Sequence, residues 1–249
     1  MGIGVQGILL WALYNYRKQK NYLLRKDGKK VNLDFQQFIP SLPYILKGIG
    51  VTLQIVSLAG ILGFALGIIL SFFKISRFKF LGWIADAYTS VFRGTPLVLQ
   101  LMLIYYGSPQ LIGYKIDPST AAILSFGLNS AAYISEIIRA GILAVDKGQS
   151  EAAMALGVPY RPAMMDIILP QAMKNILPAL MNEFITLTKE SAIVTVIGVT
   201  DVMRRAYIVG GEKFSYFEPI LIAGLIYYIM VMILTLLGKG IERRMRRSD

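Results

Sequence analysis

The chain has 249 residues, of which 55% are hydrophobic and only 16% charged, and its mean hydropathy of +0.56 is higher than an ordinary soluble domain shows. It contains no Cys and no His, which excludes disulfides and removes the commonest metal ligand and general base, so hydrolytic or redox chemistry on this chain is not expected. A net charge of +11 would indicate nucleic-acid binding in a soluble protein, but here the charges are bunched between apolar runs and favour a membrane protein.

The first forty residues contain an apolar stretch followed by a basic one. Residues 3–14 number only about a dozen, which is short for a membrane span, and residues 16–30 are strongly basic. The region lacks the basic leader and the small-residue cleavage site of a secretory signal. An amphipathic interfacial helix and an additional short hydrophobic span both stay open as interpretations. We therefore predict a basic, unassigned extension over residues 1–40 and a transmembrane domain over residues 41–247.

Three apolar segments follow in the first part of the transmembrane domain. Residues 49–73 carry no charge and are long enough to cross a bilayer. Within them, Gly63 and Gly67 form a pair of small residues that lets another helix approach closely. The second segment, residues 80–107, is weaker because charged residues and the motif Arg-Gly-Thr-Pro interrupt it. The third segment, residues 120–145, begins after Asp-Pro-Ser, which is a helix-start signal.

Two further segments complete the set. The fourth, near residues 177–202, follows two prolines and is rich in polar side chains. The fifth, residues 219–238, is uncharged and starts with proline, which is favoured at the first position of a helix. The sequence therefore predicts an all-α integral membrane protein with five spans.

Basic residues in the short connections predict the orientation. Lys74, Arg77 and Lys79 follow the first span directly, and the basic tail at residues 239–249 falls on the same side after four more crossings. That side is expected to be the cytoplasm. The basic residues before the first span violate this rule, because they would lie outside.

One connection, residues 151–172, is apolar but too interrupted by glycine and prolines to span a bilayer. Gly148 is expected to end the third span and Ser150 to cap a new helix, with Glu151 in its first turn where the helix dipole favours a carboxylate. Alanines follow, and Gly157 is expected to end the helix after about two turns. A helix this short needs support, either from its own bundle or from a partner surface.

The spacing of the residues in this connection resembles the signature of the permease subunits of bacterial ABC importers. The pattern is Glu-Ala-Ala, three residues, Gly, nine residues, Ile, one residue and Leu-Pro, and its fixed positions are Glu151, Ala152, Ala153, Gly157, Ile167, Leu169 and Pro170. Residues 88–107, 131–157 and 169–194 and the last span are similar to the polar amino acid branch of these permeases. The resemblance covers about residues 35–247, with a small departure at Lys-Glu-Ser-Ala-Ile-Val in place of the usual Lys-Asp-Thr-Ser-Leu.

This resemblance implies the type I ABC importer permease fold, with a five-helix core, and a bacterial cell membrane location with a cytoplasmic C-terminus. It implies that residues 147–172, the coupling segment, dock onto a separate ATPase. The implied partners are two ATPase subunits, a second permease that is identical or related, and an external amino-acid-binding protein. ATP and Mg would bind the ATPase, because this chain has no Gly-x-x-x-x-Gly-Lys-Ser/Thr loop and is expected to carry no cofactor or metal.

Polar residues inside the predicted spans are candidates for the substrate path. A charge at the bilayer centre costs about 2.5 to 3.5 kcal/mol on insertion scales, so charged residues in spans are expected to face the bundle. The candidates are Glu136, Asn182, Glu183, Thr186, Lys189 and Glu190. Lys189 and Glu190 suit the carboxylate and ammonium of a zwitterionic ligand. For Glu136, which lies three residues from Arg139, the sequence favours a structural ion pair that locks helices together over substrate contact.

The motif formed by Arg93, Gly94, Thr95 and Pro96 predicts a break in the second span, because proline cannot continue the helical hydrogen bonds. The break is either a hinge for alternating access or a static kink.

The leading hypothesis is therefore a transport subunit, not an enzyme, of an ATP-driven amino acid importer. The alternative is a partner-independent channel or secondary carrier for a small polar solute, which the polar fourth span would also suit. An intramembrane enzyme is disfavoured because the chain lacks His, Cys and a convincing catalytic pair.

Overall fold

A computed structural model describes residues 33–246. The chain divides into two compact units, one ending at Gln37 and one from Phe38 onward. The predictions for residues 3–14 and 16–30 lie outside the described residues, as do the last three residues of the basic tail. The second unit, which contains the membrane helices, begins three residues before the predicted boundary at residue 41.

Within the described part of the chain, every regular element is a helix. In chain order they are η1 (Gln36–Ser41), α2 (Leu42–Leu46), α3 (Gly48–Ile75), α4 (Lys79–Gly94), α5 (Leu97–Ile112), α6 (Pro118–Leu143), α7 (Lys147–Ala155), α8 (Tyr160–Pro162), the π-helix η2 (Ala163–Ile168), α9 (Leu169–Glu190), the 3-10 helix η3 (Ser191–Ile197), α10 (Val202–Lys213) and α11 (Phe217–Arg246).

Helices α3 and α6 form the most extensive helix–helix contact of the described residues. A Cβ added to Gly63 would lie 2.9 Å from Ser130 Cβ, and one added to Gly67 would lie 2.6 Å from Ile134 Cγ2, so neither position has room for a side chain. Lipid gives little hydrophobic drive between helices, and close backbone packing supplies the attraction instead. The prediction that these two glycines admit a second helix is confirmed, and the second helix is α6.

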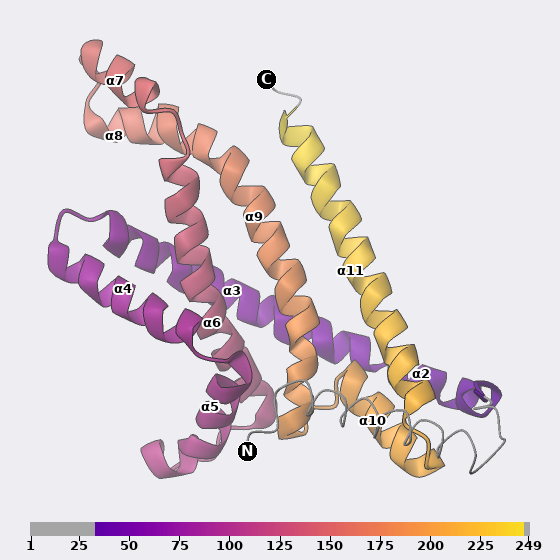
Figure 1. Ribbon diagram of the computed structural model, residues 1–249. Helices are drawn as coiled ribbons and strands as arrows, with labels where there is room; N and C mark the ends of the chain where they lie inside the picture. The colour runs from indigo at the N-terminus through magenta and orange to yellow at the C-terminus, as the bar shows by residue number, and fades with distance from the viewer. Residues whose placement is uncertain (1–32, 247–249) are drawn as a thin grey trace, which may run out of the picture. The chain divides into compact units, whose positions relative to one another are not determined.

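Helices α6, α9 and α11 lie side by side, and α3 crosses them (Figure 1). One buried cluster joins α3, α5, α6 and η3 around Leu101 and Phe126. A second cluster joins α2, α10 and α11 around Ile45 and Val209. The polar helix α9 packs between α6 and α11 and also contacts α3, although two of its polar side chains, Asn182 and Lys189, stay exposed.

The predicted spans correspond to described helices, with corrected bounds in two cases. Helices α3, α6 and α11 are long and apolar enough to cross a membrane. The second segment is two helices, α4 and α5, and the predicted bounds of the fourth, near residues 177–202, are wrong, because α9 starts at Leu169 and ends at Glu190. Pro170 sits in the first turn of α9, directly after the π-helix η2, so the chain is helical on both sides of it and Pro170 does not break the helix.

Helix α10, which the sequence did not predict, begins at a buried carboxyl group. Asp201 accepts hydrogen bonds from the Arg204 backbone N–H (2.8 Å), the Thr195 hydroxyl (3.1 Å) and the Tyr227 hydroxyl (2.8 Å). Burial raises the pKa of the Asp201 carboxyl above its ordinary value, and the hydrogen bonds that it accepts oppose this shift. The Tyr227 bond ties the start of α10 to α11.

The predicted break in the second span is confirmed, and it lies at Thr95 and Pro96, between α4 and α5. Gln100 Nε2 donates to the Phe92 carbonyl (2.8 Å) and to the Thr95 hydroxyl (2.8 Å), and Asn129 Nδ2 of α6 also donates to the Phe92 carbonyl (3.0 Å). These side chains satisfy backbone groups that the break exposes, as a bilayer requires.

Two residues of the motif lie at the end of α4, just before the break. Arg93 lies over the Tyr133 ring, 5.3 Å from its centroid, and Gly94 is the last residue of α4. Whether Arg93, Gly94, Thr95 and Pro96 act as a hinge stays a prediction.

A cluster of charged side chains joins the end of α3 to α4 and α6. The Lys74 side chain, only 3% exposed, forms ion pairs with Asp86 (3.1 Å) and with Glu136, and it donates to the Thr89 hydroxyl (2.9 Å). Glu136 also pairs with Arg139 (2.8 Å). The Glu136–Arg139 ion pair is therefore present, and Lys74 joins it, which the sequence did not reveal; a substrate-path role for Glu136 stays a prediction.

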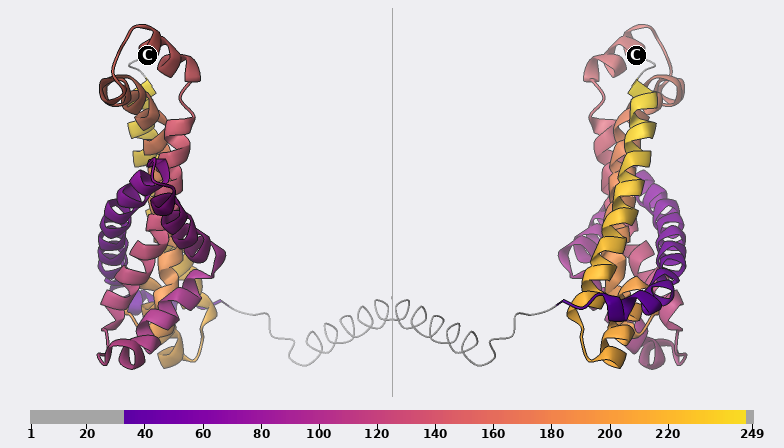
Figure 2. Two further views of the ribbon diagram at one scale, coloured as in Figure 1. Left: turned by 90° about the vertical axis from the view of Figure 1, so that its left-hand side faces the viewer. Right: turned by 90° about the vertical axis from the view of Figure 1, so that its right-hand side faces the viewer.

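The cluster also shows how deep these charges lie. Lys74 follows directly on the uncharged run of α3, so Glu136, which contacts it, lies near the edge of the hydrocarbon layer and not at its centre. Helix α6 continues for seven residues from Glu136 to Leu143, or about 10 Å at 1.5 Å per residue. The end of α6 therefore extends beyond the level at which α3 turns into α4, and Figure 2 shows α7 and α8 farther out still.

The α3–α6 contact gives the first prediction. Gly67→Val should lower the thermal unfolding temperature of the purified chain in detergent by several degrees, because overpacking costs about 1 to 3 kcal/mol. Gly50→Val is the matched control in the same helix, since a Cβ there meets no atom within 4 Å. Equal unfolding temperatures for the two variants would contradict the packing role of Gly67.

Candidate functional site: a projecting segment and a carboxylate-lined pocket

The first part of the coupling segment is helix α7. Asp146 caps it, because its Oδ1 accepts the Gly148 backbone N–H at 2.6 Å. The prediction that Ser150 caps this helix and that Gly148 ends the third span is therefore wrong, since α6 already ends at Leu143 and both residues lie inside α7. Asp146, four residues before Ser150, is the N-cap residue instead, so the helix starts earlier than predicted.

Gly157 ends this helix as predicted. It has φ +70°, and the Val158 N–H bonds back to the Ala153 carbonyl at 2.9 Å. This left-handed turn is the usual glycine ending of a helix, and a side chain there would be strained. The chain reverses at this point, so the second part of the coupling segment returns beside the first (Figure 1).

The second part consists of α8, η2 and the start of α9. Ile167 and Leu169 are half-buried, whereas Pro170 is exposed in the first turn of α9. Gln171 Nε2 donates to the Ile167 carbonyl (2.9 Å) and to Gln149 Oε1 of α7 (3.2 Å). The π-helix η2, which contains Ile167, thus forms the support on which α7 rests, and Gln171 links the two parts.

The first three signature positions lie on α7, where two side chains are exposed and one is buried. Ala153 is buried at 2% exposure and packs α7 onto its support, because η2 is an element that α7 contacts. Glu151 and Ala152 are exposed. The small alanine side chain allows the close approach that holds a two-turn helix in place.

Four large apolar side chains are exposed along α7, α8 and η2. They are Met154 (69% exposed), Leu156 (81%), Tyr160 (64%) and Met165 (62%), and we call them the α7–α8 apolar face. The sequence prediction did not include them, although apolar residues on a connection beyond the spans are a signal for a contact surface. Helix α7 lies past the level of the α3–α4 turn (Figure 2), and the bundle leaves these four side chains exposed.

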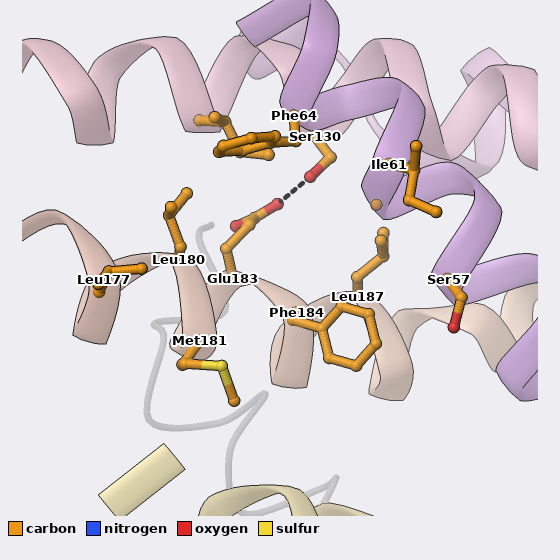
Figure 3. Close-up of a pocket in the computed structure, with 12 residues that line it drawn as sticks. Ser57, Ile61, Phe64, Ser130, Leu177, Leu180, Met181, Glu183, Phe184 and Leu187 are labelled. Carbon is orange, nitrogen blue, oxygen red and sulfur yellow. Dashed lines mark hydrogen bonds between the residues drawn. The ribbon is translucent and has the colours of Figure 1, made fainter. Parts of the chain in front are cut away.

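A pocket lies between α3, α6 and α9, with a cavity of about 390 Å³ (Figure 3). Its lining is apolar, with Phe64 and Phe184 as aromatic walls and Leu177 and Met181 along α9. Glu183 is the carboxylate of this lining, and its Oε1 accepts a hydrogen bond from the Ser130 hydroxyl at 2.9 Å. An apolar cavity with one convergent polar pair is typical of a small-molecule site.

The structure brings only one of the six predicted substrate-path residues to this pocket. Glu183 lines it, whereas Glu136 belongs to the Lys74 cluster. Asn182 and Lys189 are exposed and Thr186 and Glu190 half-buried on α9, and none of these four is part of the lining. Ser130, Phe64 and Phe184 are lining residues that the prediction missed, because α3 and α6 meet α9 only in the fold.

Comparison with known proteins identifies the protein family. Residues 63–247 match the model of a family described as the binding-protein-dependent transport system inner membrane component. The chain belongs to this family. It is therefore a transport permease and not an enzyme, and the resemblance seen in its sequence is confirmed.

Relatives of this permease include permease proteins of amino acid transport systems. It is 62% identical to the arginine transport system permease protein ArtQ of Bacillus subtilis over 88% of this chain and 100% of that protein. It is 50% identical to the putative glutamine transport system permease protein GlnP of Rickettsia felis over 84% and 96% of the two chains. A crystal structure of an amino acid ABC transporter with histidines matches at a TM-score of 0.83 and 44% identity, over 86% and 100% of the two chains.

The permease accordingly has the type I ABC importer fold, built from apolar helices that pass the membrane several times. The alternative of a partner-independent channel or carrier is set aside by membership of this family. Among the described residues, no group of three His, Cys, Asp or Glu side chains is placed to hold a metal ion.

Proposed function

We propose that this permease imports a cationic amino acid, using ATP that is hydrolysed with Mg by two separate ATPase subunits. The observation that carries the proposal is the α7–α8 apolar face, which an isolated membrane bundle would have no reason to expose. The 62% identity to an arginine transport permease supports the substrate class.

The coupling role is assigned to Glu151, Ala152, Ala153, Gly157, Ile167, Leu169 and Pro170. In this proposal α7 docks onto an ATPase subunit through its exposed residues, while Ile167 and Leu169 hold it against the bundle. Because η2 runs directly into α9, movement of α7 would be passed to a membrane helix without a flexible joint. ATP binding must favour one of two permease states for this coupling to operate.

The orientation that fits this role places the coupling segment and the C-terminus in the cytoplasm. The C-terminal end of α11 lies at the same end of the bundle as α7, and the turn after α3 with its basic residues faces that way (Figure 1). Excess Lys and Arg on short connections marks the cytoplasmic side of membrane proteins. An external binding protein would then deliver the substrate at the opposite end.

A complete path is proposed to need two permease chains, identical or related. Within each chain Glu183 is proposed as the substrate contact, because it lines the pocket and has no ion-pair partner among residues 33–246. A guanidinium or ammonium group would pair with this carboxylate and relieve an uncompensated charge in an apolar cavity. A neutral amide substrate could not form such an ion pair. Glutamine, which the name of the Rickettsia relative gives for that protein, is a substrate of this kind.

Coupling is tested with Glu151→Lys and Gly157→Val. Both variants should lose most amino acid uptake in proteoliposomes that contain the permease, its ATPase and the binding protein, while basal ATP hydrolysis continues. Gly113→Val is the matched control, because Gly113 has nearly the same backbone conformation (φ +67° against +70°) but lies at the other end of the bundle. Unchanged uptake and unchanged substrate-stimulated ATPase activity in both test variants would refute the docking role.

Substrate recognition is tested with Glu183→Gln in the same proteoliposomes, across a panel of amino acids. Arginine uptake should fall roughly tenfold or more relative to wild type, because a hydrogen bond to a charged group contributes about 1.5 to 3 kcal/mol. Glu190→Gln is the control, since it removes the same charge from α9 outside the pocket lining. An equal loss in both variants, or a wild-type preference for glutamine over arginine, would rule out Glu183 as the site of a cationic substrate.

A further inference from the structure

The turn between α3 and α4, residues 72–84, exposes an unusual density of large aromatic side chains. Phe72 (68% exposed), Phe78 (73%), Phe80 (69%) and Trp83 (68%) all point away from the bundle. We call residues 72–84 the α3–α4 corner. Aromatic residues gather where hydrocarbon meets the lipid head groups, because their rings are apolar but tolerate a polar surrounding.

Two cations of the corner, Arg77 and Lys79, are exposed and have no ion-pair partner among the described residues. Lys74 differs, because it turns inward and is paired with Asp86 and Glu136. No acidic residue occurs between Lys74 and Asp86, and Asp86 is engaged by Lys74. The corner therefore presents two uncompensated positive charges beside its aromatic side chains.

The position of the corner along α3 sets its depth. The uncharged residues 49–73 would span about 38 Å as a helix, which is enough to cross the hydrocarbon layer, and the corner follows at once. On α4 the exposed residues Phe80, Ile84 and Val91 continue the apolar surface, whereas Ala85 and Thr89 face inward. An apolar helix face that ends in aromatic and basic residues matches the profile of a bilayer edge.

We propose that the α3–α4 corner binds an anionic phospholipid. Arg77 and Lys79 bind the phosphate and the charged head group. Phe80 and Trp83 lie among the parts of the acyl chains that are nearest to the head group. The choice of an anionic lipid follows from charge: a zwitterionic head group brings its own cation and leaves the two protein charges uncompensated. A polar surface of a second protein would not suit the four exposed aromatic rings.

Trp83 makes the proposal measurable, because lipids with brominated acyl chains quench a tryptophan that they contact. The only other tryptophan, Trp11, is replaced by Phe, and the full-length chain is reconstituted in phosphatidylcholine vesicles with increasing brominated phosphatidylglycerol. A second series uses brominated phosphatidylcholine. Each cation near an anionic surface changes binding about fivefold, so with two cations quenching should show a preference for phosphatidylglycerol on the order of 25-fold.

The test variant is Arg77→Gln with Lys79→Gln, in which this preference should vanish. Both side chains are exposed, so the variant should keep its unfolding temperature. The matched control, Lys115→Gln with Lys213→Gln, removes the same number of charges from the other end of the bundle and should keep the preference.

Three outcomes would overturn the proposal. Equal quenching of the parent chain by the two brominated lipids would show that the cations do not select an anionic head group. A preference that survives in the test variant would place the lipid contact elsewhere. Absence of quenching by either lipid would show that a protein surface, such as a second permease chain, covers the corner. None of these measurements depends on transport, so the proposed substrate and coupling roles are tested separately.

Discussion

The buried ammonium group of Lys74 is the constraint on which the arrangement of this permease depends. A charge at this depth must be paired, and its partners Asp86 and Glu136 come from α4 and α6. Glu136 is the less exposed of the two partners, at 22% against 73% for Asp86, so its removal would leave the buried Lys74 charge with only a largely exposed partner. The pairing therefore fixes the level of α6 against the α3–α4 corner, and everything on α6 beyond Glu136 is held outside the hydrocarbon layer.

The position of α6 relative to the α3–α4 corner explains why the coupling segment and the pocket have different surroundings. The coupling segment lies past the level of this corner (Figure 2), and the bundle leaves apolar side chains exposed there, which suit a protein partner. The pocket lies between the spans, where a single carboxylate has large energetic weight. Helix α9 connects them: Leu169 and Glu183 are fourteen residues apart, or about 21 Å along one helix. The helix is continuous between the two sites, with Pro178 inside it, so a movement at one site can be carried to the other.

Sequence patterns predicted the features of the fold that depend on neighbouring residues. The uncharged run of α3, the Gly63 and Gly67 pair and the helix end at Gly157 each follow from residues within a few positions of one another. The predicted start of the fourth span, near residue 177, is wrong because the chain is already helical through Pro170, directly after the π-helix η2. The contacts of Lys74 with Glu136 and of Ser130 with Glu183 join residues 62 and 53 positions apart, and no pattern in one sequence encodes such pairs. The signature in the coupling segment indicated the family, but not that Ala153 faces the support while Leu156 is exposed.

The most direct measurement of the central claim, that α7 projects toward a separate ATPase, is thiol cross-linking. The chain has no cysteine, so Leu156→Cys places a single thiol at the α7–α8 apolar face. In membranes that contain a cysteine-free ATPase with one engineered surface thiol, we expect a cross-linked product whose yield changes when ATP is added. Leu225→Cys, on the exposed apolar side of α11, should give none. If Leu156→Cys forms no such product, or is labelled from outside intact cells by a membrane-impermeant thiol reagent, the coupling segment does not engage the ATPase and the account is wrong.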